Sequence, residues 1–322
     1  MVRDERGEGI VMRIASIDIG TNTILLLVAD MADDGTLRVQ SDAQVIARLG
    51  RGVDRSGMIE WDAFTRCEQY LRAYLAVARA ANVDVVRCTG TSALRDARNG
   101  GEFIDYMYQK LGLEIEILSG DEEALWTYGG AISSFADRAA SFAVLDIGGG
   151  STEMTVGKGF QIEQRLSQDI GCVRLTEKYL HHTPPTDEEI AVMREAIDAA
   201  IPRFPDFDIA TTTLIGVAGT VTTLAAVEQQ LPAYDAGRIA GFFLTREMIH
   251  HRFAQFCQMD RQQLQHELRI DPGRADIILV GVAILDRLCA LRNIPGIVVS
   301  ERGLRYGIAM REWERRLETS AR

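Results

Sequence analysis

Two segments of this chain share one pattern, an apolar strand that runs into an aspartate and a glycine-containing loop. The first is SIDIGTNT at 16–23, and the second is VLDIGGGSTE at 144–153. Asp146 follows Asp18 by 128 residues, and the same offset aligns Gly148 with Gly20. Glycine backbone lets amide groups converge on phosphate oxygens, while a strand-end carboxylate can hold a divalent cation. The repeat therefore predicts two similar halves that face each other across a cleft, with a metal-bound phosphate in it.

Composition sets the class of protein. At 322 residues the chain can form two domains with a core each, and 47% apolar with 25% charged residues is ordinary for a globular protein. A net charge of −11 and a pI of about 5.1 argue against nucleic-acid and anionic-membrane binding, which need broad basic surfaces. We expect no nucleic-acid partner and no membrane partner.

Cysteine usage and the N-terminus bear on location. The five cysteines are odd in number and far apart, without a Cys-x-x-Cys pair. This pattern is typical of a reducing compartment. The first residues, MVRDERGEGIVMR, contain no apolar core of a secretion signal, and no apolar run approaches the roughly 20 residues of a membrane span. We expect a cytoplasmic protein.

Both halves predict the same order of elements, βββαβαβα, which makes a mixed sheet covered by helices. In the first half the expected strands are 13–19, 23–30, 36–47, 83–90 and 114–118. In the second half they are 141–147, 151–158, 160–168, 211–217 and 296–300. The expected domains are a flexible extension at 1–12, a first domain at 13–136, a second at 137–302, and a C-terminal helix at 303–322 that can pack back on the first domain.

The two glycine loops differ in how strongly each one, taken alone, indicates a ligand site. The Asp18 loop by itself is equally consistent with an ordinary Asp-x-Gly turn. Three glycines in a row, Gly148, Gly149 and Gly150, cost conformational entropy that a plain turn does not require, so they indicate close approach of a ligand. A strand follows this loop and Glu153 replaces the last glycine of a dinucleotide fingerprint, which argues against a Rossmann cofactor. A further glycine turn, GVAGTVTTLA at 216–225, opens a helix and favours an anion.

Two more segments carry candidate polar residues. In SGDEEA at 119–124, Glu122 and Glu123 are either favourable acids in a first helical turn or carboxylates that orient a water molecule. In TGTSALRDA at 89–97, Thr91 or Ser92 is either a helix cap or a phosphate donor. Arg95, one turn further on, is either a solvated surface charge or a partner for an oxyanion.

Five segments carry a resemblance when they are taken together and in this order: SIDIGTNT, GTSALRDA, SGDEEA, VLDIGGGSTE and GVAGTVTTLA. Over residues 13–310, the chain resembles the exopolyphosphatase and guanosine pentaphosphatase family. That family belongs to the superfamily of acetate and sugar kinases, actin and heat-shock chaperones. The resemblance implies two ribonuclease H-like (actin-like ATPase) domains, each a mixed five-stranded sheet with helices, and an active-site cleft between them.

The resemblance also implies an activity, the removal of the terminal phosphate from inorganic polyphosphate by a magnesium-dependent hydrolase acting on acid anhydrides. In this family a glutamate-activated water attacks in line, and the motif places that base on Glu123, with Glu122 as the alternative; Arg95 would clamp an oxyanion. The implied metal ligands are Asp18, Asp146 and Glu153. The candidate phosphate-binding residues, from the resemblance and from the loops themselves, are Gly20, Thr21, Asn22, Thr91, Ser92, Gly148, Gly149, Gly150, Ser151, Gly219 and Thr220.

Several alternatives stay open at this point. The same loops suit guanosine pentaphosphate (pppGpp) as substrate, and superfamily relatives include small-molecule kinases; a catalytically inactive polyphosphate sensor is a third reading. The resemblance implies Mg²⁺, with Mn²⁺ as a substitute and K⁺ as a monovalent cofactor, and a homodimer. Longer relatives continue into a further helical region, so from the length and the acidic charge of this chain we expect low processivity on polyphosphate.

Overall fold

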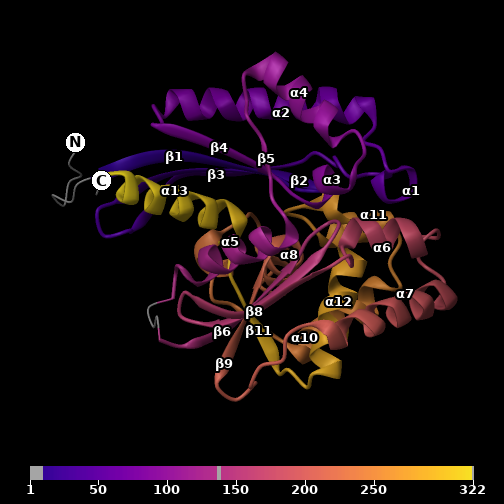
Figure 1. The fold of residues 1–322 in the computed structure, drawn as a ribbon. Helices are drawn as coiled ribbons and strands as arrows, with labels where there is room; N and C mark the ends of the chain where they lie inside the picture. The colour runs from indigo at the N-terminus through magenta and orange to yellow at the C-terminus, as the bar shows by residue number, and fades with distance from the viewer. Residues whose placement is uncertain (1–9, 136–138, 321–322) are drawn as a thin grey trace. The chain divides into compact units, whose positions relative to one another are not determined.

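The computed structural model describes residues 10–135 and 139–320, and the chain divides into two compact units. The first unit runs through Gly130 and resumes at Leu304, while Ala131–Gly303 forms the second. Each unit is a mixed sheet with helices packed on it (Figure 1). The expected domain boundary at 136 and 137 lies outside the described residues, as do residues 1–9 of the expected extension.

The sheet of the first unit has the strand order β3-β2-β1-β4-β5. β1, β2 and β3 form an antiparallel meander, and β4 and β5 continue the sheet in parallel. The strands are β1 (Ile10–Ile19), β2 (Thr23–Ala32), β3 (Leu37–Ile46), β4 (Val85–Gly90) and β5 (Glu116–Ile117). The helices of this unit are α1 (Val53–Ser56), α2 (Trp61–Ala80), α3 (Ser92–Asp96), α4 (Gly100–Leu111), α5 (Gly120–Ile132) and α13 (Leu304–Ser320).

Alternation along β1 and β2 explains why this sheet is covered on both faces. Ala15, Ile17 and Ile19 belong to the core under α2, whereas Met12 and Ile14 belong to the core that contains the α13 residues Tyr306 and Ala309. Side chains on a strand point alternately to opposite faces, so two apolar sets need two covering layers. In Figure 1, α2 and α4 lie on one face of the sheet and α13 lies on the other.

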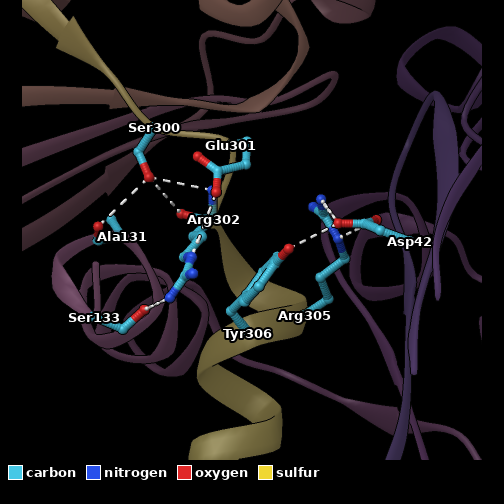
Figure 2. A network of polar contacts seen from close by, with 8 residues as sticks. All are labelled: Asp42, Ala131, Ser133, Ser300, Glu301, Arg302, Arg305 and Tyr306. Carbon is cyan, nitrogen blue, oxygen red and sulfur yellow. Dashed lines mark hydrogen bonds and ion pairs between the residues drawn. The ribbon is translucent and has the colours of Figure 1, made fainter. Parts of the chain in front are cut away.

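Ion pairs join α13 to the first sheet although the helix is distant in sequence. Arg305 donates to both carboxylate oxygens of Asp42 at 3.0 and 2.8 Å, and the Tyr306 hydroxyl donates to the same carboxylate at 2.9 Å (Figure 2). Arg87 on β4 makes a second bidentate pair with Glu312, at 2.8 Å for both bonds. These contacts make the C-terminal helix part of the first unit.

The second unit repeats this topology. Its sheet has the order β10-β11-β9-β6-β7-β8, in which β8-β7-β6-β9-β11 corresponds to the five strands of the first sheet. Ile14 pairs with Val85 in the first sheet and Phe142 with Thr213 in the second, so the offset of 128 residues holds across both strand pairs. The strands are β6 (Ser141–Ile147), β7 (Thr152–Lys158), β8 (Gln161–Gln168), β9 (Thr212–Val217), β10 (Phe243–Thr245) and β11 (Gly296–Val299).

Apolar helices form the core of the second unit. α12 is buried along most of its length and packs with residues of α6, α7, α8 and α10. After β11, Ser300 contacts Ala131 in the last turn of α5, and Arg302 contacts Ser133 just after that helix (Figure 2). The helices are α6 (Cys172–Tyr179), α7 (Asp187–Ala200), α8 (Ala218–Glu228), α9 (Ala236–Ile239), α10 (Arg246–Phe256), α11 (Arg261–Glu267) and α12 (Ile278–Leu291), with short 3-10 turns η1 (Ile201–Arg203) and η2 (Pro272–Arg274).

Two details of the predicted fold are wrong. The second sheet has six strands, not five, because the three-residue strand β10 pairs antiparallel with β11; so short a segment shows no alternation in sequence. The predicted N-terminal extension also ends too late, because β1 already begins at Ile10. Met12 is buried against α13, a contact that its charged sequence neighbours conceal.

The cysteines match the expectation of reduced thiols. All five are buried and none forms a disulfide. Burial raises the pKa of the Cys67 thiol to about 12, so this thiol stays protonated near neutral pH. Among the described helices, none combines the length and the apolar character that crossing a bilayer requires.

Candidate active site

The first glycine loop links β1 to β2 by a tight turn. The Gly20 N–H donates to the Thr23 carbonyl at 2.9 Å, and a Cβ atom on Gly20 would lie 3.1 Å from that oxygen. Asp18, two residues before the turn, is buried. The Asn22 carbonyl accepts from the N–H groups of Ala47 and Arg48, which holds the loop against the segment after β3.

This loop carries donors that have no acceptor in the part of the chain that the structure describes. The backbone N–H groups of Thr21 and Asn22 make no hydrogen bond there. The Asn22 side chain is also buried, and its Nδ2 atom has no partner among the described residues. Buried polar groups are normally satisfied, so three adjacent unpaired donors indicate a place for an oxygen-rich ligand.

The second glycine loop makes the same turn between β6 and β7. The Gly148 N–H donates to the Ser151 carbonyl at 3.0 Å, and a Cβ atom on Gly148 would lie 3.0 Å from that oxygen. The carbonyls of Gly148 and Gly149 accept from the first N–H groups of α6, and Gly150 accepts from the Arg174 guanidinium at 2.7 Å. The N–H groups of Gly149 and Gly150 have no acceptor within residues 10–135 and 139–320. They correspond to Thr21 and Asn22, so the repeat extends to individual donors.

Carboxylates line up beside the second loop. Asp146 and Glu153 are direct cross-strand partners on β6 and β7, and Glu153 is in turn opposite Ser167 on β8. Directly opposed residues on one face of a sheet have neighbouring side chains. The Ser167 hydroxyl donates to Glu153 Oε1 at 2.6 Å, and Glu153 is only 2% exposed. The structure thus brings together two of the predicted metal ligands of this unit.

The start of α8 belongs to the same edge of the second sheet, because Asp146 on β6 is in register with Val217, the last residue of β9. Ala218 has a φ of +67°, and α8 begins at this residue. Thr220 is buried, with its Oγ1 3.5 Å from the Cys172 thiol. Gly219 and Thr220 therefore lie at the strand end that also carries the Gly148 loop.

Arg274 at this helix start was missed by the sequence reasoning. It is buried, and a Cβ atom on Gly219 would lie only 1.8 Å from Arg274 Nη1, so the guanidinium packs directly on the glycine. Its Nε donates to Asp271 at 2.5 Å. A buried arginine over a helix N-terminus is well suited to an anion. The only signal in the sequence is an arginine in the turn before an apolar helix, and no local pattern connects it to Gly219.

The two glutamates of SGDEEA have different environments. The Glu122 carboxylate accepts from Ser119 N–H at 2.9 Å and from Ser119 Oγ at 2.8 Å, while Ser119 Oγ accepts from Glu122 N–H at 3.2 Å. This reciprocal pair is a capping box at the start of α5. Glu123 is buried instead, and its Oε2 accepts from Arg95 Nη1 at 3.2 Å. Arg95 Nη1 also donates to the Leu118 carbonyl at 2.7 Å, so it connects α3 to the start of α5.

Thr91 and Ser92 are buried at the end of β4. The Thr91 N–H donates to Ile19 at 3.2 Å, which places this segment beside the first glycine loop. The Ser92 hydroxyl donates to Asp96 Oδ2 at 3.2 Å, and the Thr91 carbonyl accepts from the first N–H groups of α3. Neither side chain caps α3, since the Thr91 side chain accepts no helix N–H and Ser92 bonds Asp96, and both residues lie at the edge of the sheet where Asp18 lies.

Two of the predicted metal ligands, Asp146 and Glu153, lie opposite each other on neighbouring strands. In residues 10–135 and 139–320, no three His, Cys, Asp or Glu side chains are clustered closely enough to form a complete ligand set. Mg²⁺ in enzymes is commonly held by one or two carboxylates together with water and substrate phosphates. The pair Asp146 and Glu153, with the loop amides beside it, fits that mode of binding.

A family model for the Ppx/GppA phosphatase family matches residues 27–316. The chain belongs to this family. It is 36% identical over 318 residues to exopolyphosphatase 2 of Mycobacterium tuberculosis, covering 92% of this chain and 98% of that protein. The crystal structure of the Aquifex aeolicus member of the family superposes with a TM-score of 0.80 at 30% identity, covering 95% of this chain and 98% of the other.

A second relative bears on the substrate. The guanosine-5'-triphosphate,3'-diphosphate pyrophosphatase of Vibrio cholerae is 29% identical over 217 residues, which cover 66% of this phosphatase-family chain and 43% of that protein. The family fold, two actin-like units each with a mixed sheet, is the one predicted from the motifs.

Proposed function

We propose that this Ppx/GppA phosphatase is an exopolyphosphatase that hydrolyses the terminal phosphoanhydride of inorganic polyphosphate and releases orthophosphate. Similarity to an exopolyphosphatase over nearly the whole length of both chains supports this substrate class. The single observation that carries the proposal is the repeated turn. Among the residues that the structure describes, the backbone N–H groups of Thr21 and Asn22 in one unit, and of Gly149 and Gly150 in the other, have no acceptor. Converging backbone amides are a common way to bind phosphate oxygens.

Asp146 and Glu153 are the residues that we propose to hold Mg²⁺, and a metal role for Asp18 stays a prediction. Asp146 and Glu153 are adjacent on neighbouring strands, and hard oxygen ligands are those that Mg²⁺ prefers. When bound, Mg²⁺ neutralises negative charge on the phosphate oxygens. Mn²⁺ is the substitute that we expect to support turnover, and a role for K⁺ stays a prediction.

Glu123 is the residue that we propose as the general base. It accepts a proton from a water molecule whose oxygen attacks the terminal phosphorus, while the bridging P–O bond breaks and its electron pair stays with the shortened chain. The capping bonds of Glu122 support this choice, because they use that carboxylate to start α5. The contact with Arg95 orients Glu123, and a direct contact of Arg95 with an oxyanion stays a prediction.

Phosphate binding is the role that we propose for both glycine loops and for the α8 start. Gly20, Thr21 and Asn22 would act in the first unit, and Gly148, Gly149, Gly150 and Ser151 in the second. Gly219 and Thr220 offer the N-terminal amides of an 11-residue helix, beside the Arg274 guanidinium. Thr91 and Ser92 would contribute hydroxyl groups at the edge of the first sheet.

The deciding experiment compares orthophosphate release from medium-length polyphosphate and from pppGpp, each with Mg²⁺ and then with chelator. Release from polyphosphate that needs Mg²⁺ is the expected result. Preference for pppGpp would instead favour the second candidate function, which the similarity to the Vibrio cholerae enzyme supports. Absence of release from both would contradict the proposal and leave the kinase and sensor alternatives.

Two further expectations accompany this function. We propose a homodimer, which light scattering of the purified chain tests. We also propose a cytoplasmic location, which fractionation of the source cells tests.

A further inference from the structure

We propose that Ser167 is a positioning residue that orients the Glu153 carboxylate for divalent-cation binding, an inference that rests on the proposed metal role of Asp146 and Glu153. The three side chains form one row across β6, β7 and β8, because Asp146 pairs with Glu153 and Glu153 pairs with Ser167. Ser167 is on β8, which lies at the edge of the sheet. Its hydroxyl reaches Glu153 Oε1 at 2.6 Å.

The Ser167 hydroxyl lies 2.6 Å from Glu153 Oε1, well within the range of an O–H···O hydrogen bond. A bond from Ser167 to one oxygen restricts rotation of the carboxylate plane about its last torsion, which is otherwise broad for glutamate. The second oxygen is thereby held in one orientation relative to the neighbouring Asp146.

The burial of Glu153 explains why this bond is needed. Glu153 is 2% exposed on β7, whose other residues from Thr152 to Gly157 are also buried. An ionised carboxylate in such a place is costly unless it is paired or hydrogen-bonded. Ser167 supplies a hydrogen bond to it from the neighbouring strand, and unlike an arginine or lysine it adds no positive charge that would compete with a cation.

The first unit shows that the fold does not require a carboxylate here. The corresponding row in the first sheet is Asp18, Leu25 and Gln44, on β1, β2 and β3. Leu25 stands where Glu153 stands, and Gln44 where Ser167 stands. An apolar residue is therefore compatible with this strand position, and the buried pair of Glu153 and Ser167 is specific to the second unit.

When a residue that hydrogen-bonds to a metal ligand and orients it is removed, metal affinity typically weakens about 10–100-fold. For Ser167→Ala we expect at least about 10-fold weaker Mn²⁺ binding on that ground. Ser167→Thr keeps the hydroxyl on a residue that suits a strand, so it should retain the affinity of the wild type. Ser56→Ala is the matched control, because the hydrogen bonds of the Ser56 hydroxyl to described residues are all to backbone groups, those of Gly52 and Met58.

The test is a Mn²⁺ titration of the full chain, followed by the paramagnetic resonance signal of free Mn²⁺, without any phosphate compound. Weaker binding by Ser167→Ala alone, with rescue by Ser167→Thr, is the expected result. Equal affinity of Ser167→Ala and wild type would overturn the inference, as would failure of Ser167→Thr to rescue or no Mn²⁺ binding by the wild type. If Ser167→Ala does not fold in chelator, Ser167→Cys replaces it, since a thiol is a weak donor.

This readout separates the inference from the proposed function. A wild type that binds Mn²⁺ with the expected dependence on Ser167 but releases no orthophosphate would keep the positioning role and contradict the exopolyphosphatase. A wild type that hydrolyses polyphosphate, with Ser167→Ala unchanged in Mn²⁺ affinity, would contradict the positioning role alone.

Discussion

The two units of this phosphatase have the same framework but different polar residues in it. Both have a meander of three strands, a parallel strand in the same register, and a turn closed by the N–H of Gly20 or Gly148. In the second unit, Glu153 and Ser167 follow Asp146 across the sheet, whereas in the first Leu25 and Gln44 follow Asp18. The shared turn and the differing rows teach that the turn is repeated, while the row of buried polar side chains that we propose for metal binding belongs to one unit.

The proposed catalytic base is a second difference between the units. Glu123 is buried at the start of α5 in the first unit and contacts Arg95. At the corresponding strand end of the second unit, Ser300 follows β11 and contacts Ala131 and Arg302. A duplicated fold therefore supplies two similar turns, and the residues that we propose for the chemistry are ones that the duplication does not repeat.

The largest expected effect tests the role of the first unit. Glu123→Gln removes a proton acceptor at almost constant size, and we expect kcat for orthophosphate release to fall at least about 10²-fold, as general-base effects do. Glu122→Gln is the matched control, which should retain most activity and most of the stability, because glutamine at this position also forms a capping box. Steady-state kinetics and thermal unfolding of both variants decide. If Glu122→Gln is the inactive one, the assignment is reversed.

The next prediction makes the second unit resemble the first. Glu153→Leu places the residue of the first sheet at the corresponding position, and we expect Mg²⁺-dependent turnover to fall at least about 10-fold through loss of a metal ligand. The free energy of unfolding should not decrease, since replacing a buried charge with an apolar side chain is often neutral or stabilising. Denaturant titration together with the Mg²⁺ dependence of the rate checks both parts. A clear loss of stability with full activity would make Glu153 a structural residue.

A matched pair of glycine variants tests the repeated turn itself. In Gly20→Ala and Gly148→Ala, the added Cβ would lie 3.1 and 3.0 Å from the backbone oxygens of Thr23 and Ser151. Because overpacking commonly costs about 1–3 kcal/mol, we expect comparable destabilisation of the two units. Gly129→Ala is the control, since nothing lies within 4 Å of its added Cβ. Unequal effects on unfolding would show that the two turns are not equivalent.

The smallest expected effect lies in the second unit and depends on pH. Burial by itself raises the pKa of Glu189. Hydrogen bonds from Thr186 N–H, the His182 ring and His181 N–H outweigh this effect and lower the pKa to about 2. A lowered folded-state pKa adds stability that is present above the ordinary value of 4.5 and lost as pH falls toward 2. Glu189→Gln should therefore cost about 1 kcal/mol at pH 7, as cap variants do. Unfolding measured at pH 7, 5 and 3 should show the difference shrinking; a constant difference would refute this.

Much of the framework could be predicted because its signals are local. The offset between Asp18 and Asp146 identified the duplication, and alternating apolar residues marked the strands of both meanders. Glycine loops after strands have few structural explanations, so the turns at Gly20 and Gly148 were predictable. The three-residue β10 was not, because its strand pairing with β11 depends on a partner some 50 residues further along the chain.

Within the candidate site, the limit was reached where two neighbouring residues have the same chemistry. Glu122 and Glu123 are indistinguishable in sequence, and only the fold shows one carboxylate on Ser119 and the other buried beside Arg95. Arg274 was missed for a different reason. Its contact with Gly219 joins two segments that no short sequence motif spans.

The sequence by itself determined the duplication, the class of fold, the glycine turns and the family, because these depend on periodicity and on short motifs. Only the tertiary structure decided which glutamate is a cap, that Ser167 donates to Glu153, and that α13 completes the first unit through pairs such as Arg87 with Glu312. Hydrogen bonds and ion pairs of this kind depend on distances between residues far apart in the chain, and those distances exist only once the sheets have formed.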